Sequence, residues 1–423
     1  MIRARNFTCL SLFCVLAFYS SIMANTIDND QDNRLVDINA LQEWMNTKRQ
    51  VTIKEIGGNL SLSGEVRTEL QSMGETRNGV KQRGTGSAPL GPDGSVLPAN
   101  VYDVEVNVML DYRIDRGWAS IKLEFDNDAG IFNGTLNKLK VEKAYFGVRV
   151  VDTDSTTFDV ELGRRRLGNI FDSNLEFAAF MDGVVFRYDV GIDNWGDLYA
   201  HLGAFVIDER VNQYGYIGEL GFLNIASSGF YTKYSLIDWD TKDYSNEIDH
   251  LRFDFLVSQL IIGYKCFPKW FNRPIRSYVA GLYNHNAKAH SFTDNKKVNF
   301  GGYIGLSLGE IRKKGDWAFD LNYQVLAAQC VPDFDASGIG MGNAVNSSLY
   351  STVANAKGPK AVATTKETAA GNGNYRGFVA TLDYLLTNNI TFQQQWQQTI
   401  TLDKGIGPFR RYKQYEIEFI YGF

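Results

Sequence analysis

The feature that most constrains this chain is a two-residue alternation of apolar and polar side chains, which starts near Asn59 and continues to the last residue. In VYDVEVNVMLDYRID (101–115), every second residue from Tyr102 to Tyr112 is apolar, and most residues between them are acids or amides. Side chains of a strand point alternately to opposite faces, so this period predicts strands with one apolar face. The chain ends on the same pattern, YEIEFIYGF (415–423).

The lengths of the strands and of their connections distinguish a membrane barrel from a soluble sandwich, which also shows alternation. We count about 16 strands of roughly 10 residues, the length that crosses a bilayer as a tilted strand. Short connections such as DRG (115–117) alternate with long ones such as 167–180 and 328–375. We therefore predict an all-β protein, a transmembrane antiparallel β-barrel whose final strand closes against the first.

The composition supports many strands and argues against nucleic acid as a partner. Aromatic residues make up 13% of the chain, and there are 40 glycines but only 8 prolines. This mixture suits strands joined by turns. The formal net charge of −5 provides no basic surface for DNA or RNA.

The N-terminal region predicts export and divides the chain into three parts. Residues 1–24 carry Arg3 and Arg5, then an apolar run, then small residues ending at Ala24, which is the order of a secretory signal peptide. Residues 25–58 form a leader in which apolar residues at helical spacing predict a short amphipathic helix on the periplasmic side. Residues 59–423 form the predicted barrel.

Two cysteines, Cys266 and Cys330, lie within the barrel region. The strand count places them at opposite ends of the barrel, separated by an apolar band of about 25 Å. A disulfide requires Cα atoms within about 7 Å, so we expect no bond between them.

The segment VEKAYFGVRVVDTDSTTFDVELGRRRLGNIFDSNLEFAAFMDGVVFRYD (141–189) resembles the porin superfamily of Gram-negative outer membranes. The resemblance is carried by Ala144-Tyr145-Phe146-Gly147, by the turn 152–155 and by Leu162-Gly163-Arg164. The segment LQEWMNTKRQVTIKEIGGNLSLSGEVR (41–67) is similar to porins of chlamydia-related bacteria. The stretch 167–180 takes the place of the constriction loop, but it is short and lacks the usual P-E-F-G-G type of sequence.

The resemblance also implies a location and partners. It implies the cell outer membrane, contact with its lipids and lipopolysaccharide, and, as one option, a homotrimer. Tyr421 and Phe423 match the C-terminal aromatic signal that the barrel-assembly machinery reads.

The candidate pore-lining residues are charged side chains on the predicted water-facing side of different strands. Asp172 and Glu176 belong to the stretch 167–180, and Asp182 begins the next strand. If that stretch folds inward, these acids face a basic wall, and opposed charges across a narrow gap focus a transverse field. The basic wall consists of Arg67, Arg113, Arg149, Arg165 and Arg187.

The sequence offers little support for catalysis. His201, His250, His285 and His290 have no Ser or acid nearby in a catalytic pattern, and no phosphate loop or HExxH motif occurs. We expect no enzyme activity, no cofactor and no metal site. The predicted function is a porin, a water-filled channel for the passive diffusion of small hydrophilic solutes and ions. The alternative is a barrel that acts mainly as a surface adhesin or antigen through the long connection 328–375.

Overall fold

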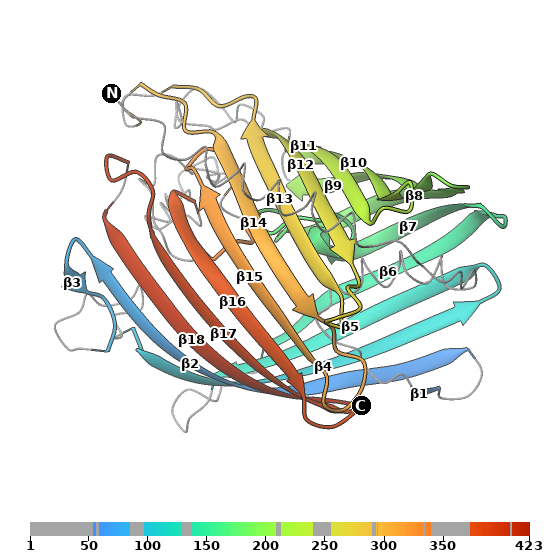
Figure 1. Cartoon of the computed structure of the whole chain (residues 1–423), viewed down its shortest axis with the longest axis horizontal. Helices are drawn as coiled ribbons and strands as arrows, with labels where there is room; N and C mark the ends of the chain where they lie inside the picture. Colours follow the sequence, from blue (N-terminus) through green and yellow to red (C-terminus); the bar gives the residue numbers. More distant parts are fainter. Residues whose placement is uncertain are drawn as a thin grey trace, which may run out of the picture.

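The described part of the chain forms a closed antiparallel barrel (Figure 1). The predicted signal peptide and the predicted helix in the leader lie outside the described residues. A computed structural model describes residues 54–55, 59–84, 97–128, 138–208, 213–239, 255–289, 293, 295–332, 335–339, 373–406 and 408–423.

The wall of the barrel consists of long strands in chain order, each hydrogen-bonded to the next. The strands are β1 (Lys54–Glu55), β2 (Leu60–Arg77), β3 (Val80–Lys81), β4 (Asn100–Ile114), β5 (Gly117–Asp128), β6 (Lys138–Asp152), β7 (Thr156–Arg166), β8 (Phe180–Ile192), β9 (Gly196–Asp208), β10 (Gln213–Ile225), β11 (Phe230–Asp238), β12 (Leu256–Cys266), β13 (Ile275–Asn284), β14 (Phe300–Gly309), β15 (Trp317–Leu326), β16 (Tyr375–Leu385), β17 (Ile390–Thr401) and β18 (Arg410–Gly422).

Sixteen of these strands, β2 and β4–β18, form the wall, and β18 pairs with β2 to close it. The two-residue strands β1 and β3 both pair with β2. The predicted strand count and the predicted closure of the last strand on the first are therefore confirmed.

The seam between β18 and β2 explains the alternation at the end of the chain. Tyr421 and Phe419 point outward and are 49% and 45% exposed, whereas Glu418 points inward and is 6% exposed. The backbones of Gly64 and Phe423 exchange two hydrogen bonds of 2.9 Å. A Cβ atom at Gly64 would lie only 2.5 Å from the Phe423 ring, so the terminal aromatic packs directly over a glycine at the seam.

The two ends of the barrel differ as the sequence predicts. The connections β4–β5, β6–β7, β8–β9 and β16–β17 are short turns, and the chain ends beside them, because Gly422 bonds to Asn389 of the β16–β17 turn. In Figure 1 the C-terminus lies at this end. The opposite end carries the long connections. Strand β12 begins at Leu256, and residues 240–254 lie outside the described ones.

The helical content of the described residues is minimal. The described helical element is a single 3-10 turn, η2 (Leu167–Asn169). No helix within the described ranges is long and apolar enough to cross a membrane. The outer surface carries many exposed aromatic and aliphatic side chains, among them Leu70, Phe146, Leu220 and Trp396.

The hydrophobic core lies inside the barrel and on one side of it. Phe205, Ile217 and Val257 point inward from β9, β10 and β12, and they are at most 4% exposed. Inward glycines make room for aromatic rings on the neighbouring strand. Tyr199 covers Gly221, its directly paired residue, where a Cβ atom would lie 2.0 Å from the ring. Tyr231 covers Gly263 in the same way.

Candidate channel and its inner loop

The connection between β7 and β8, residues 167–179, folds into the barrel, and we call it the inner loop. Leu167, Phe171 and Leu175 are fully buried, and Phe177 is 1% exposed. Their side chains belong to the two apolar clusters formed with inward residues of β8–β14. Because an apolar loop of this kind would be unstable in water, its residues favour the inward fold, which the sequence had left open.

Polar contacts attach the middle of the inner loop to the barrel wall. The Asp172 carboxylate accepts a hydrogen bond of 3.0 Å from Lys233 of β11, and its backbone N–H donates to Glu219 of β10. Gln259 of β12 donates to the Asp172 carbonyl at 2.7 Å and accepts from the Ser173 hydroxyl at 2.8 Å. Burial opposes ionisation of Asp172, but Lys233 and Arg276 outweigh it and hold the pKa of Asp172 below its usual range.

A second piece of chain, which we call the inner segment (residues 327–332 and 335–339), enters the barrel from the β15–β16 connection. The Asp335 carboxylate accepts hydrogen bonds from the backbone N–H groups of Phe177 at 3.1 Å and Ala179 at 3.0 Å. Ser337 donates its hydroxyl to the Glu176 carbonyl at 2.9 Å. The inner segment therefore binds the far side of the inner loop, and it also contains Cys330, which is fully buried.

Cys330 and Cys266 are both free, as predicted. Cys266 ends β12 beside a short turn, whereas Cys330 follows β15 at the opposite end. Burial raises the pKa of the Cys330 thiol well above its usual range, and the nearby Glu176 acts in the same direction. This thiol is therefore not activated as a nucleophile.

We call the inner faces of β8–β15 the packed half of the barrel and the inner faces of β17, β18, β2 and β4–β7 the charged half. In the charged half, charged side chains pair along and across strands, and several of them stay partly exposed. The Arg67 side chain bonds Glu65 of the same strand and is 27% exposed. Glu105 of β4, whose side chain is 24% exposed, lies 3.8 Å from the Arg67 guanidinium. This half provides a charged, partly exposed surface along the barrel interior.

Carboxylates are concentrated on three adjacent strands of the charged half. Glu69 of β2 and Glu416 and Glu418 of β18 each place a carboxylate oxygen within 4.8 Å of the others. Further acids point to the same side from β2 and β4, namely Glu65, Asp103, Glu105 and Asp111. Acidic side chains are therefore concentrated on this part of the wall.

The five arginines predicted to line the pore lie on different strands of one continuous stretch of wall. Arg67 and Arg149 point inward and pair with acids, Arg149 to Asp159 at 2.8 Å. Arg113 is exposed near the short-turn end of β4.

Arg165 and Arg187 lie at the boundary between the two halves. Arg165 is 7% exposed, bonds Glu161 and lies 4.3 Å from the centre of the Tyr145 ring. Arg187 lies 3.8 Å from Glu161. The structure thus brings these two arginines to one acid, Glu161, a residue that the sequence did not single out as part of a constriction.

The positions of the three predicted acids differ from the expectation. Asp172 and Glu176 lie on the inward-folded loop, but the Asp172 carboxylate, whose side chain is 14% exposed, pairs with Lys233 of the packed half, and the Glu176 carboxyl group is buried beside the inner segment. Asp182 points to the outside of the barrel and pairs with Arg164 at 3.0 Å, with side chains 55% and 46% exposed. Its position is even-numbered, like those of the outward residues Phe186 and Tyr188 in the same strand, so its strand face excludes it from the pore lining.

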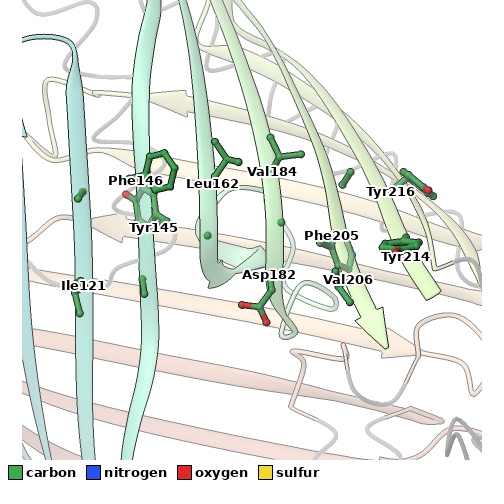
Figure 2. A pocket seen from close by; sticks show the side chains of 15 residues that line it. Ile121, Tyr145, Phe146, Leu162, Asp182, Val184, Phe205, Val206, Tyr214 and Tyr216 are labelled. Atoms are coloured by element: carbon green, nitrogen blue, oxygen red, sulfur yellow. The ribbon is translucent and has the colours of Figure 1, made fainter. Parts of the chain in front are cut away.

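Asp182 also borders an apolar depression on the barrel surface, with a volume of about 880 Å³ (Figure 2). The depression crosses β5–β10. It is shallow over small residues such as Ala119, Ala144 and Ala204 and is bordered by the larger Phe146 and Tyr216. Because it lies on the apolar outer face, it is not part of the interior path.

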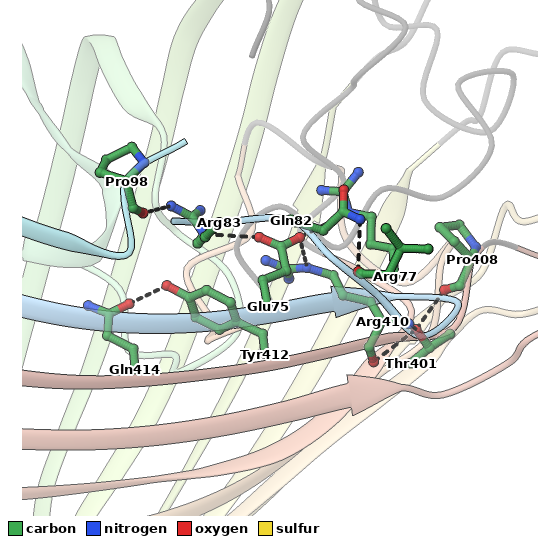
Figure 3. A network of polar contacts seen from close by, with 11 residues as sticks. Glu75, Arg77, Gln82, Arg83, Pro98, Thr401, Pro408, Arg410, Tyr412 and Gln414 are labelled. Atoms are coloured by element: carbon green, nitrogen blue, oxygen red, sulfur yellow. Dashed lines mark hydrogen bonds and ion pairs between the residues drawn. The ribbon is translucent and has the colours of Figure 1, made fainter. Parts of the chain in front are cut away.

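A second polar network fastens β2 to β18 at the end with long connections (Figure 3). Glu75 of β2 accepts hydrogen bonds from Arg410 at 2.8 Å, Arg77 at 2.9 Å and Arg83 at 3.1 Å. Arg410 is 2% exposed and lies against the Tyr412 ring, 4.6 Å from its centre. One buried carboxylate with three guanidinium partners locks the seam and the β2–β3 hairpin together.

The sequence reasoning missed the residues that hold the inner loop in place. Lys233, Gln259 and Asp335 are distant from the loop in sequence, and none belongs to a motif. A usable signal was present in YGYIGELGFL (214–223) and LIIGYK (260–265), where, apart from Glu219 and Lys265, glycines and bulky apolar residues occupy the inward positions that elsewhere hold charges. Such strands do not present a polar face to water, which indicates that something apolar covers them.

Comparisons with known proteins support the fold. The sequence matches no protein-family model, and no curated protein matches it significantly. The structure is similar to the high-pH structure of Pseudomonas putida OprB, with a TM-score of 0.52 and 8% identity, covering 86% of this chain and 94% of that one. A mutant porin of Rhodopseudomonas blastica gives a TM-score of 0.42 and 10% identity, covering 86% and 100%. The similarity to OprB supports the barrel fold that the resemblance to porins predicted.

Proposed function

We propose that the chain is a channel through which small hydrophilic solutes and ions diffuse across the outer membrane of a Gram-negative bacterium. The observation that carries this proposal is the division of the barrel interior. The inner loop and the inner segment pack against β8–β15, while the charged half keeps side chains such as Arg67 and Arg149 partly exposed. A 16-strand barrel is wide enough to leave a water-filled path beside such a loop.

The location is supported by the outer surface and the C-terminus. Exposed aromatic and aliphatic side chains face outward from most strands, which suits contact with lipid. We propose contact with outer-membrane lipids and lipopolysaccharide, export by the signal peptide 1–24, and assembly that depends on Tyr421 and Phe423. Whether the chain works alone or as a homotrimer stays a prediction of the resemblance, as does an origin in a chlamydia-related bacterium.

We further propose that the channel prefers cations. Permeating ions pass the acids of β18, β2 and β4, where Glu69, Glu416 and Glu418 lie close together. Arg67 compensates part of this charge through Glu65 and Glu105. A negative wall in a narrow aqueous path attracts cations and repels anions.

Planar bilayers test the channel function directly. Purified protein, folded in detergent or lipid, should produce stepwise ohmic currents in potassium chloride, with a reversal potential of the cation-selective sign in a salt gradient. Protein unfolded by heat before addition is the control. Correctly folded barrels that insert without conducting would contradict the proposal.

No observation favours the adhesin alternative. The described parts of the long connection, the inner segment, pack inside the barrel through Asp335 and Ser337. Residues 340–372, the part of this connection that an adhesin would use to bind a surface, lie outside the described ones. We therefore base the proposed function on the interior path alone.

A further inference from the structure

The contact between the inner loop and the inner segment contains an unusual acid. Glu176 is 1% exposed, and neither of its carboxylate oxygens has a hydrogen-bond partner among the described residues. A buried, unpaired carboxylate is very costly, and its neutral, protonated form costs far less. The structure therefore favours Glu176 as a neutral acid.

The groups around Glu176 strengthen this requirement. Asp335 of the inner segment and Glu219 of β10 both act on it with negative charge, and Cys330 lies close enough to be affected by it. Burial is the largest cause, followed by Asp335 and Glu219, and together they raise the pKa of Glu176 well above its usual range. Asp172, the remaining acid of the loop, is already paired with Lys233.

Asp335 is the second buried acid of the contact. It is fully buried, and its carboxyl group holds the backbone N–H groups of Phe177 and Ala179 on either side of Ala178. Burial raises the pKa of Asp335 to about 7, against the opposing effect of those two N–H groups and of Arg166. Both sides of the contact thus bury an acid that ionises with difficulty.

We propose that Glu176 and Asp335 form a proton-dependent clasp, which holds the inner loop to the inner segment while at least one of the two carboxyl groups is protonated and releases it when both ionise. Ionisation places two negative charges in a site that already faces Glu219. Opening lets water reach both carboxylates, which removes the cost of their burial. The backbone hydrogen bonds between Ala178 and Asp335 and between Ser337 and Leu175 would separate in the same event.

The direction of the pH dependence follows from proton linkage. A carboxyl group exposed by opening has its ordinary pKa of about 4, so the closed clasp binds more protons than the open one. The advantage of the closed state is complete below that pH. It declines as the pH rises through about 7, the pKa of Asp335 in the closed state.

Cys330 provides a native reporter for this opening, because it is fully buried within the inner segment. In a Cys266→Ser background it is the only cysteine after residue 14. Its rate of modification by a maleimide is measured from pH 5 to pH 9 in the folded barrel. Each rate is divided by the rate for the same protein unfolded in denaturant at that pH, which removes the effect of thiol ionisation itself.

We expect the protection of Cys330 to fall about tenfold or more between pH 5 and pH 9, since two groups titrate over this range. The double variant Glu176→Gln/Asp335→Asn keeps the shapes of both side chains but cannot ionise, so its protection should change by less than about twofold with pH. Because the amide of the second substitution offers one acceptor where Asp335 offers two to Phe177 and Ala179, its protection should also be lower at every pH. The matched control is Asp182→Asn, which removes an outward acid of the neighbouring strand and should follow the unmodified protein. The same pH profile in the double variant and the unmodified protein, or a flat profile in both, would overturn the clasp.

A single variant covers the case in which the double variant does not assemble. Glu176→Gln alone removes the costlier charge and should make the pH dependence clearly shallower. An unchanged profile in this variant would also contradict the proposal.

The effect of the clasp on current rests on the proposed channel function, and the two are tested separately. Single-channel conductance should change between pH 5 and pH 9 in the unmodified protein and stay constant in the double variant. Conductance without any pH-dependent protection of Cys330 would support the channel function and contradict the clasp. Protection that depends on pH in a barrel that does not conduct would support the clasp and contradict the channel function.

Discussion

The packed half and the charged half are built from the same kind of alternating antiparallel strand, yet their inner faces have opposite characters. In the packed half, Tyr199, Ile217 and Lys233 are at most 4% exposed, because the inner loop covers them. In the charged half, the side chains of Arg67, Lys122 and Glu105 stay 20–27% exposed. Arg67 pairs with Glu65 and Glu105, and Lys122 pairs with Glu142. Alternation therefore specifies the barrel, whereas the identity of the inward residues specifies what fills it.

The difference also separates two kinds of polar residue. Lys233 is 1% exposed at its side chain, pairs with Asp172 and lies over the Tyr199 ring. Lys122 forms a comparable pair with Glu142, but both side chains are 20% exposed. Buried pairs are sensitive to the loss of one member, and exposed pairs are not. Variants in the two halves should therefore differ most in stability and least in ion preference.

The largest effect is expected from Phe171→Ala in the inner loop. Phe171 is fully buried and packs against Phe177 with ring centres 5.7 Å apart. Removing it should cost about 3–5 kcal/mol of the free energy of unfolding, as for other large-to-small changes in a core. The matched variant Arg113→Ala, at an exposed site of the charged half, should change it by about 0.5 kcal/mol or less.

Denaturant unfolding in detergent, followed by tryptophan fluorescence, measures both variants. Equal losses in the two would show that the inner loop does not contribute a core. The comparison between the two halves would then lose its basis.

A second, smaller difference is expected between Lys233→Met and Lys122→Met. The first leaves Asp172 buried without its cation and should destabilise the inner loop by about 3 kcal/mol. The second removes a partly exposed pair and should cost about 1 kcal/mol or less. The same unfolding measurement applies, and a larger cost for Lys122→Met would reverse the assignment of the two halves.

The smallest expected effect concerns ion preference. Neutralising Glu69, Glu416 and Glu418 together with Gln should lower the cation-to-anion permeability ratio by roughly twofold, because these acids line the proposed path. Glu219→Gln, in the packed half, should leave the ratio unchanged, since Glu219 is buried behind the inner loop where it bonds Tyr199 and Asp172.

Reversal potentials in a salt gradient measure this ratio. The effect of the triple variant should shrink in about 1 M salt, where the screening length falls to about 3 Å. A shift for Glu219→Gln as large as that for the triple variant would mean that ions pass through the packed half.

The sequence was sufficient to predict the barrel because the relevant signal is local. Alternation, the number of strands, the short turns at one end and the closing strand that ends in Phe423 can all be read by counting. The outward orientation of Asp182 could also have been predicted, because Asp182 is an even-numbered residue of the same strand as the outward Val184, Phe186 and Tyr188.

The side of the barrel wall against which the inner loop packs could not be predicted from the local sequence pattern. Asp172 and its partner Lys233 are 61 residues apart in the sequence, and Phe177 and its partner Asp335 are 158 residues apart. These contacts depend on how the barrel curves and on which inward residues are apolar, and neither is encoded in the loop itself. The expectation that Asp172 and Glu176 face an arginine wall failed for this reason.

The most direct test of the account is whether the current follows the charged half. In a background without Cys266 and Cys330, single cysteines are introduced as Glu69→Cys in the charged half and Gln259→Cys in the packed half, where Gln259 is 1% exposed and bonds Asp172 and Ser173. A membrane-impermeant thiol reagent is then added to single channels in a planar bilayer. The account predicts a stepwise fall in current for Glu69→Cys and no change for Gln259→Cys. Block at Gln259→Cys with no effect at Glu69→Cys would contradict it.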